Sequence, residues 1–165
     1  MRRRFVLLAA LVALLSVALE ARAGEKPAPA QPLGLTLTTS LGGGGAIDSA
    51  TPHGLFEGEL VLGYELGLGI RPELGLLVCT GSDPYVGLRP GLHYSFEYMP
   101  IYARLAVDWS RPEDSWLFRW VLLGTGIELR LTDLFGLFAE ADLGVPVRSR
   151  IGVLLAARGG FSFRF

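Results

Sequence analysis

The sequence predicts an all-β fold, an eight-stranded antiparallel up-and-down transmembrane β-barrel, from two observations. Large apolar residues alternate with polar or small residues over stretches of ten residues or more, which is the period of a β-strand and not of a helix. Turn residues divide the chain into an even number of such stretches, and the connections alternate between tight turns and more variable polar loops. This arrangement is typical of barrels that cross a membrane.

The N-terminal residues are expected to stand apart from the fold. Three arginines precede an apolar run from Phe5 to Leu19, and Ala21-Arg22-Ala23 has the small-x-small form of a signal-peptidase site, so residues 1–23 are expected to be a secretory signal peptide. As a helix the apolar run would reach only about 22 Å, which is short for a membrane anchor in a core of about 30 Å. Residues 24–32, with the proline-rich stretch KPAPAQP, are expected to be a linker, and residues 33–165 a single barrel domain.

The charge and the cysteine content narrow the function classes. The chain has 15 basic and 16 acidic residues, and removal of the signal peptide takes away four arginines and one glutamate, which leaves a net charge of about −4. This balance argues against a nucleic-acid partner. Cys79 is the only cysteine, so an exported chain would form no internal disulfide, and Cys79 is expected to be a small buried group.

Turn residues place the strands in order. The eight expected strands are Leu33–Leu41, Leu55–Leu68, Leu74–Thr80, Tyr85–Tyr98, Ile101–Ser110, Trp116–Leu131, Leu134–Val145 and Ile151–Phe165. Tight turns are expected at Arg71-Pro72, Met99-Pro100 and Thr132-Asp133. The first connection, GGGGAIDSATPHG, is long, and its run Gly42–Gly45 is expected to be a mobile surface loop because no phosphate-binding motif follows it.

Side-chain volume indicates which phase of the alternation faces outward. In LFEGELVLGYELGL, for example, Phe56, Leu60 and Leu62 share one phase, while Glu57 and Glu59 share the other with glycines. The interior of an eight-stranded barrel is the crowded side, so the small and charged phase is expected to face the lumen. The large apolar phase then covers the outside, which is favourable in lipid and unfavourable for a soluble monomer.

Aromatic residues are expected to form a belt at each end of the barrel. The belt at the end with the tight turns contains Tyr64, Phe96, Tyr98, Phe135, Phe163 and Phe165, and the opposite belt contains Trp109, Trp116 and Trp120. In the sixth strand the phase of the tryptophans conflicts with that of Leu123, so we expect a β-bulge near Leu122-Leu123 that turns Trp116 and Trp120 outward and Arg119 inward. The alternative is that the two tryptophans fill the upper lumen.

The last eight residues, RGGFSFRF, carry a specific resemblance. Arg158, Gly160, Phe163 and Phe165 occupy the positions polar-x-Gly-x-x-aromatic-x-aromatic of terminal strands in bacterial outer-membrane barrels. The mature chain thus resembles the small eight-stranded outer-membrane barrels of the OmpA-like and OmpX-like kind. The resemblance implies localisation in the outer membrane of a Gram-negative bacterium, contact with its lipids and lipopolysaccharide, and recognition of the terminal signature by the barrel assembly machinery.

The predicted lumen is rich in charged residues. It is expected to contain Glu57, Glu59, Glu65, Arg89, His93, Glu97, Arg104, Asp108, Glu128, Arg130, Glu140, Asp142, Arg158 and Arg164, with Tyr102 among them. Buried charges need partners, so these residues are expected to form a salt-bridge network that plugs a barrel too narrow for a water channel. A path for ions or protons through the network is the alternative.

Catalysis is a weaker interpretation. The spacing of His93 and Ser95, with Glu97 nearby, is similar to the His-x-Ser pair of lipid A deacylases, but Phe96 stands where that family has an asparagine, and both residues face the predicted lumen. Asp48 and His53 do not make a metal site by themselves. We therefore expect a monomer without cofactor, metal or catalytic activity, with a structural or surface-interaction role; the alternatives are a lipid A-modifying enzyme and a soluble periplasmic binding barrel.

Overall fold

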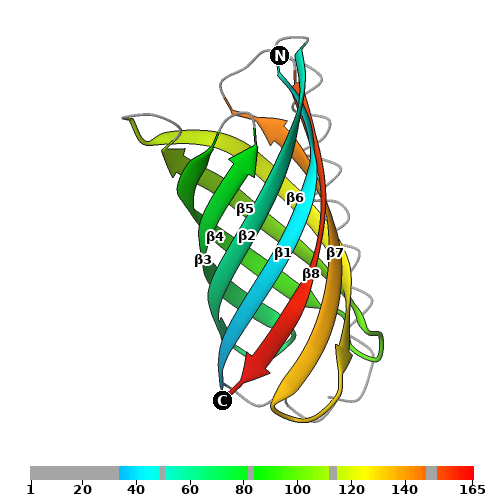
Figure 1. The fold of residues 1–165 in the computed structure, drawn as a ribbon. Helices are drawn as coiled ribbons and strands as arrows, with labels where there is room; N and C mark the ends of the chain where they lie inside the picture. Colours follow the sequence, from blue (N-terminus) through cyan, green and yellow to red (C-terminus); the bar gives the residue numbers. More distant parts are fainter. Residues whose placement is uncertain (1–33, 49–50, 82–83, 112–114, 148–151) are drawn as a thin grey trace, which may run out of the picture. The chain divides into compact units, whose positions relative to one another are not determined.

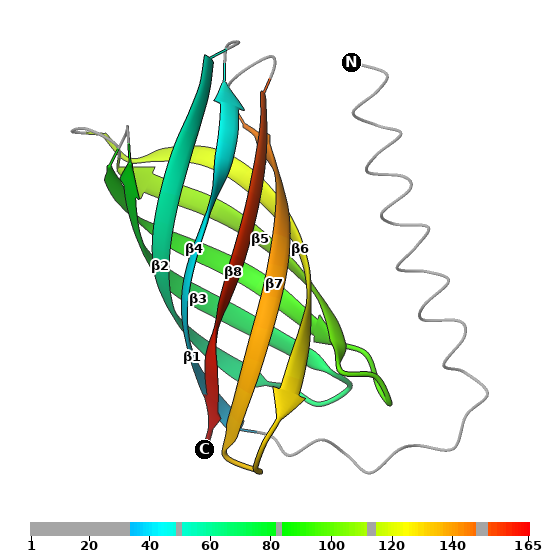
Figure 2. The same cartoon turned by 45° about the vertical axis from the view of Figure 1, so that its right-hand side comes forward.

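The chain folds into a closed barrel of eight antiparallel strands (Figures 1 and 2). The computed structural model describes residues 34–48, 51–81, 84–111, 115–147 and 152–165. The expected signal peptide and linker lie outside the described residues. The predicted all-β class, the number of strands and their antiparallel order are confirmed.

Each strand pairs with its neighbours in the sequence, and β1 also pairs with β8, which closes the barrel. The strands are β1 (Gly34–Asp48), β2 (Thr51–Glu65), β3 (Ile70–Gly81), β4 (Tyr85–Ser95), β5 (Ile101–Arg111), β6 (Leu117–Arg130), β7 (Phe135–Pro146) and β8 (Gly152–Arg164). The short connections 66–69, 96–100 and 131–134 lie at the end that holds Phe165, which we call the turn end. The opposite ends of the strands make up the other end of the barrel, the loop end.

The glycine run in the first hairpin is strand and not loop, so the expected mobile loop at Gly42–Gly45 is wrong. These residues pair with β2 on one side and with β8 on the other, and β1 continues to Asp48. A Cβ atom added at Gly42 would lie 2.4 Å from the Cβ of Arg158. The run therefore allows β1 to approach β8 closely, a role of glycine that the sequence does not distinguish from loop flexibility.

The sequence predicted the turn between β2 and β3 at Arg71-Pro72. In the structure the turn comes before these two residues. Gly67 and Gly69 have φ angles of 81° and 74°, in the left-handed region that glycine adopts without steric cost. The strand therefore starts at Ile70, and Arg71 and Pro72 belong to β3. Because of this earlier turn, Arg71 points into the barrel, where it is buried.

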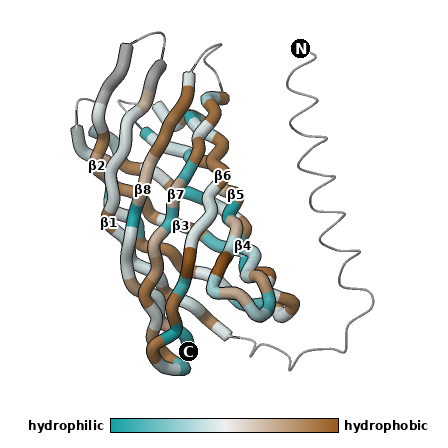
Figure 3. Tube along the Cα trace, turned by 90° about the vertical axis from the view of Figure 1, so that its right-hand side faces the viewer, coloured by the Kyte–Doolittle hydropathy of each residue, from teal (hydrophilic) through white to brown (hydrophobic). Residues whose placement is uncertain are grey.

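Side chains alternate between a polar lumen and an apolar outer face. Inward positions are odd-numbered in β2, β3 and β4 and even-numbered in the other strands, except before Arg119 in β6, and they are mostly buried. Large apolar side chains on the outer face stay about half exposed, for example Leu62 at 50%, Leu76 at 53% and Leu155 at 60%. Hydropathy changes from residue to residue along the strands (Figure 3). Within the described part of the chain, no helix is long and apolar enough to cross a membrane.

A β-bulge in β6 gives one tryptophan the opposite orientation to the one expected. Asp108 pairs with Trp120 and Trp109 pairs with Phe118, so Arg119 is the extra residue and the bulge is not at Leu122-Leu123. The bulge turns Phe118 outward, whereas Trp120 is only 3% exposed inside the barrel and the expected outward facing is wrong. On the outer face Trp116 is exposed and contacts Trp109, with ring centroids 4.9 Å apart.

The expected aromatic belt at the turn end lies on the outer face. Tyr64 and Phe165 are exposed there, at 46% and 73%. Phe135 packs against Phe161 and Phe163 of β8, with ring centroids 5.8 and 5.4 Å apart. The alternating phenylalanines of the last strand therefore lie outside the barrel against their neighbours in β7.

Candidate functional site: the charged lumen

The lumen brings most of the predicted charged residues together. Those buried inside the barrel are Glu57, Glu59, Glu65, Arg89, His93, Arg104, Asp108, Glu140, Asp142 and Arg158. Glu128 and Arg164 are partly buried towards the turn end. Arg130 is exposed at the end of β6, and Glu97 lies in the turn after β4, so these two residues lie outside the buried network.

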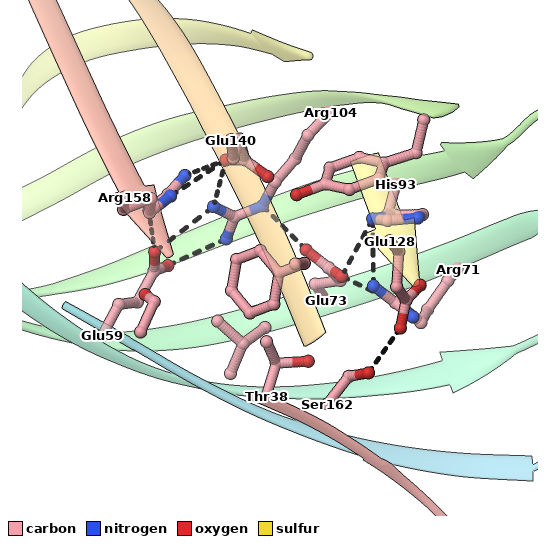
Figure 4. Close-up of a pocket in the computed structure, with 14 residues that line it drawn as sticks. Thr38, Glu59, Arg71, Glu73, His93, Arg104, Glu128, Glu140, Arg158 and Ser162 are labelled. Carbon is pink, nitrogen blue, oxygen red and sulfur yellow. Dashed lines mark hydrogen bonds and ion pairs between the residues drawn. The ribbon is translucent and has the colours of Figure 1, made fainter. Parts of the chain in front are cut away.

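Glu59 on β2 is the centre of the network (Figure 4). Its carboxylate accepts hydrogen bonds from Arg104 at 2.8 and 3.2 Å, from Arg89 at 3.2 Å, and from Arg158. The three arginines come from β5, β4 and β8, and the Glu59 side chain is 1% exposed. One carboxylate therefore links four strands across the lumen.

The three arginines extend the network to other carboxylates. Arg104 reaches Glu73 at 2.8 Å and Glu140 at 3.5 Å. Arg158 pairs with Glu140 and Asp142, the latter at 2.9 Å. Ion pairs between described residues join four arginines to seven carboxylates in one connected network, whose members are Arg71, Arg89, Arg104, Arg158, Glu57, Glu59, Glu65, Glu73, Asp108, Glu140 and Asp142.

The network contains two residues that the sequence analysis missed, Arg71 and Glu73. Arg71 donates to Glu73 at 2.8 Å and to Glu65 at 3.1 Å. Both lie on inward positions of β3, in phase with Gly75 and Cys79. The two residues were missed because the turn was expected at Arg71-Pro72. The glycines at 67 and 69 were the better indication of where the chain turns.

His93 is held in one tautomer by its neighbours. Nη2 of Arg71 lies 2.9 Å from Nδ1 of His93, and a guanidinium can only donate, so Nδ1 accepts and the ring proton is on Nε2. Nε2 lies 3.0 Å from Oγ of Ser95 and donates to it, and the ring stacks on Tyr102 with centroids 4.3 Å apart. In this arrangement Nε2 has no lone pair to take the serine proton, as a general base must.

Glycines on neighbouring inward positions make room for the network. A Cβ added at Gly75 would lie 2.2 Å from Oε1 of Glu59, and one at Gly124 would lie 2.5 Å from Oδ1 of Asp142. The large charged side chains thus lie across from residues without side chains. This pairing of sizes is the physical reason for the many glycines in the polar phase of the sequence.

Little space remains among the charged side chains. The cavity lined by Glu59, Glu73, Arg104 and Glu140, among others, has a volume of about 20 Å³, which is room for about one water molecule. Towards the loop end the lumen is apolar, since Trp120, Leu122 and Leu154 pack together there with Ala46 and Ala106.

A second apolar group lies beside this layer. Leu77, Cys79 and Tyr85 are buried together, and the guanidinium of Arg119 lies over the Tyr85 ring, 4.3 Å from its centroid. Cys79 is 2% exposed, as a small buried group would be. Arg119 thus reaches the lumen from the bulge in β6.

The residues of the terminal signature divide between the two faces. Arg158 is in the lumen network, while Phe163 and Phe165 point outward. Gly160 lies against β1, and a Cβ added there would be 1.9 Å from the carbonyl oxygen of Thr39. The signature therefore lies at the seam where β8 closes the barrel.

No metal-binding cluster of three or more histidine, cysteine or acidic residues occurs among the described residues. The side chains of Asp48 and His53 lie outside that part of the chain. The charged lumen residues are paired with one another instead.

Comparisons with known proteins place the fold. Neisserial surface protein A superposes with a TM-score of 0.60 at 14% identity, over 79% of this chain and 97% of that one. The N-terminal barrel domain of Pseudomonas aeruginosa OprF gives 0.50 at 16% identity, over 78% and 97%, and a de novo designed transmembrane β-barrel gives 0.53 at 12%, over 82% and 98%. The fold is that of small eight-stranded outer-membrane barrels. No family model and no curated protein matches the sequence.

Proposed function

We propose that this protein is a monomeric integral barrel of the Gram-negative outer membrane, exported by its signal peptide, with a structural or surface-interaction role and no catalytic activity. In this proposal the charged lumen is a plug. The observation that carries the proposal is the single ion-pair network centred on Glu59, which links strands across a lumen with room for about one water. A buried network of this kind ties the wall together and leaves no continuous water path.

The outer face supports a membrane location over a soluble periplasmic barrel. A soluble binding barrel has an apolar interior that holds a ligand and a polar exterior, whereas here charged side chains fill the interior and leucines such as Leu60, Leu62 and Leu76 cover the exterior. Apolar surface transferred from water to lipid is worth roughly 25 cal/mol per Å². The outer face is therefore favourable in a bilayer and unfavourable in water.

The geometry around His93 weighs against the lipid A-modifying alternative. The Nε2 proton is donated to Ser95, so the histidine cannot accept the serine proton without first losing its own. Both side chains also lie on the lumen side of β4, away from the outer face where lipid acyl chains would lie. The resemblance to the deacylase pair is thus limited to spacing.

The partners in this proposal are membrane components. The signature residues Arg158, Gly160, Phe163 and Phe165 would be recognised by the barrel assembly machinery before the strand closes. The apolar outer face would contact outer-membrane lipids, and the loop end would contact lipopolysaccharide.

Cell fractionation tests the proposal. We expect the protein in the outer-membrane fraction, with migration on a gel that changes on heating because the folded barrel resists detergent. Recovery in the soluble periplasm would contradict the membrane location. A change in lipid A acylation on overexpression, lost in a Ser95→Ala variant, would replace the structural role by the enzymatic one.

A further inference from the structure

A hollow of about 400 Å³ lies at the mouth of the lumen, at the turn end. Ser95, Tyr102 and Glu128 line it from inward positions of β4, β5 and β6. Tyr102 and Glu128 also line the small cavity of the charged network, so the hollow adjoins that cavity from outside. Its volume is in the range of binding sites, about 300 to 1,000 Å³.

Much of the remaining wall of the hollow is apolar. The turn between β4 and β5 provides Tyr98, Met99 and Pro100, and the strands beside it provide Ile101 and Leu129. Tyr98 is 76% exposed and has a φ of 67°, a conformation that bulky residues rarely adopt. Such conformations persist where the surrounding structure holds a residue in place, and they are common at binding sites. Because exposed apolar side chains are unfavourable in water, this wall would be stabilised by a group that covers it.

The chain enters the barrel at the same end (Figure 1). β1 begins at Gly34, which pairs with Glu65 and lies next to Phe165. β5 is four strands away from β1 in either direction, so the hollow lies across the mouth from the start of β1. Eight strands about 4.8 Å apart and tilted by about 40° make a barrel about 16 Å wide. A segment that leads into β1 must cross this distance to reach the hollow.

The segment before Gly34 has a suitable length and composition. Residues 24–33 contain the stretch KPAPAQP. Proline favours the polyproline II conformation, which rises about 3.1 Å per residue, so ten residues span about 31 Å. About five of them cross the mouth, which leaves Lys26, Pro27 and Ala28 for the hollow. Proline-rich segments bind grooves lined by aromatic side chains, at a low cost in entropy because their conformation is preformed.

We propose that the proline-rich segment 24–33 lies across the turn-end mouth of the lumen and binds in the hollow. Pro27 and Ala28 contact Tyr98 and Met99, and the hydroxyl of Tyr98 donates to a backbone carbonyl of the segment. The segment thus covers the end of the lumen opposite to the apolar layer around Trp120. The inference rests on the proposed export and membrane location, in which the segment follows the cleaved signal peptide and lies in the periplasm.

Disulfide trapping in the full-length exported protein tests the inference. Lys26→Cys is combined with Met99→Cys in the test variant and with Leu68→Cys in the control, both in a Cys79→Ala background. Leu68 is an apolar residue, 71% exposed, in the turn next to the start of β1, so an undocked segment would meet it more often than Met99. We expect the disulfide at Met99→Cys to form about fivefold faster, because docking raises the effective concentration of the two thiols. Peptide mass spectrometry without reduction identifies each disulfide.

A further substitution tests the role of the wall. Tyr98→Ala should slow trapping at Met99→Cys to the rate of the Leu68→Cys control. Tyr64→Ala, which changes an exposed tyrosine of the outer face, should leave trapping at Met99→Cys unchanged. Trapping at Leu68→Cys that is equally fast or faster, no effect of Tyr98→Ala, or disulfides between two chains in place of one within the chain would each overturn the docking.

The state of each variant is established before trapping. Fractionation and heat-dependent migration on a gel show whether the barrel is folded in the outer membrane. A protein that is absent from the outer membrane would contradict the proposed function. A folded outer-membrane barrel without selective trapping would contradict only the docking of the segment.

Discussion

Removal of one arginine from the lumen should cost more stability than removal of the central carboxylate. Arg104 donates to Glu59 and Glu73, both at 2.8 Å, and lies 3.5 Å from Glu140. Because four arginines are shared by seven carboxylates in the connected network, Arg104→Met leaves three buried carboxylates with less compensation. Glu59→Gln instead removes one negative charge, and negative charges are in excess in the network.

The magnitudes follow from the cost of breaking a buried ion pair by removing one partner, about 3–5 kcal/mol. Arg104→Met should lie at the upper end, about 5 kcal/mol. Glu59→Gln should lie at the lower end, about 3 kcal/mol, because Arg89 is still paired with Glu57 and Arg158 is still paired with Glu140.

Urea unfolding of the barrel in lipid vesicles, followed by tryptophan fluorescence, measures both values. Arg130→Met, at the exposed end of β6, is the control and should stay within about 0.5 kcal/mol of the wild type. A loss below about 1 kcal/mol for Arg104→Met, or an equal loss for the two lumen variants, would refute the reasoning from charge balance.

Three further predictions concern the seam, the terminal residue and the tryptophans. Gly160→Ala should destabilise the barrel by about 2 kcal/mol because the new Cβ meets the backbone of β1, whereas Gly159→Ala, whose nearest atom is 3.4 Å away, should be tolerated; equal urea midpoints would be evidence against the close seam. Removal of Phe165 should lower the amount of barrel in the outer membrane much more than the stability of folded barrels, and unchanged amounts on immunoblots would show that the signature is coincidental. Brominated lipid should quench the fluorescence of Trp116 strongly and that of Trp120 weakly. The variants Trp116→Phe and Trp120→Phe separate the two signals, and stronger quenching of Trp120 than of Trp116 would place Trp120 on the outer face.

The alternation in the sequence was sufficient to predict the barrel. A period of two survives in every strand because lipid and lumen impose opposite demands on successive side chains. In β2 this period placed Glu57 and Glu59 inside and Leu60 and Leu62 outside, as the structure has them. Side-chain volume then decided which face was which.

Local sequence patterns do not predict the structure where tertiary contacts decide it. The run Gly42–Gly45 has the composition of a loop, but it is strand because β8 comes close to it. Trp120 was misplaced because a bulge at Arg119 reverses the phase of the strand, and a shift of one residue exchanges the two faces. The position of a bulge depends on the partner strand, which a local pattern does not contain.

The conductance of a planar lipid bilayer that contains the folded protein tests the central claim, a lumen closed by ion pairs, most directly. We predict a current that does not differ from that of the protein-free bilayer, because the network around Glu59 leaves a cavity of about 20 Å³ and an apolar layer covers it at the loop end. Discrete conductance steps from wild-type protein whose heat-dependent gel migration shows that it is folded would contradict the plug.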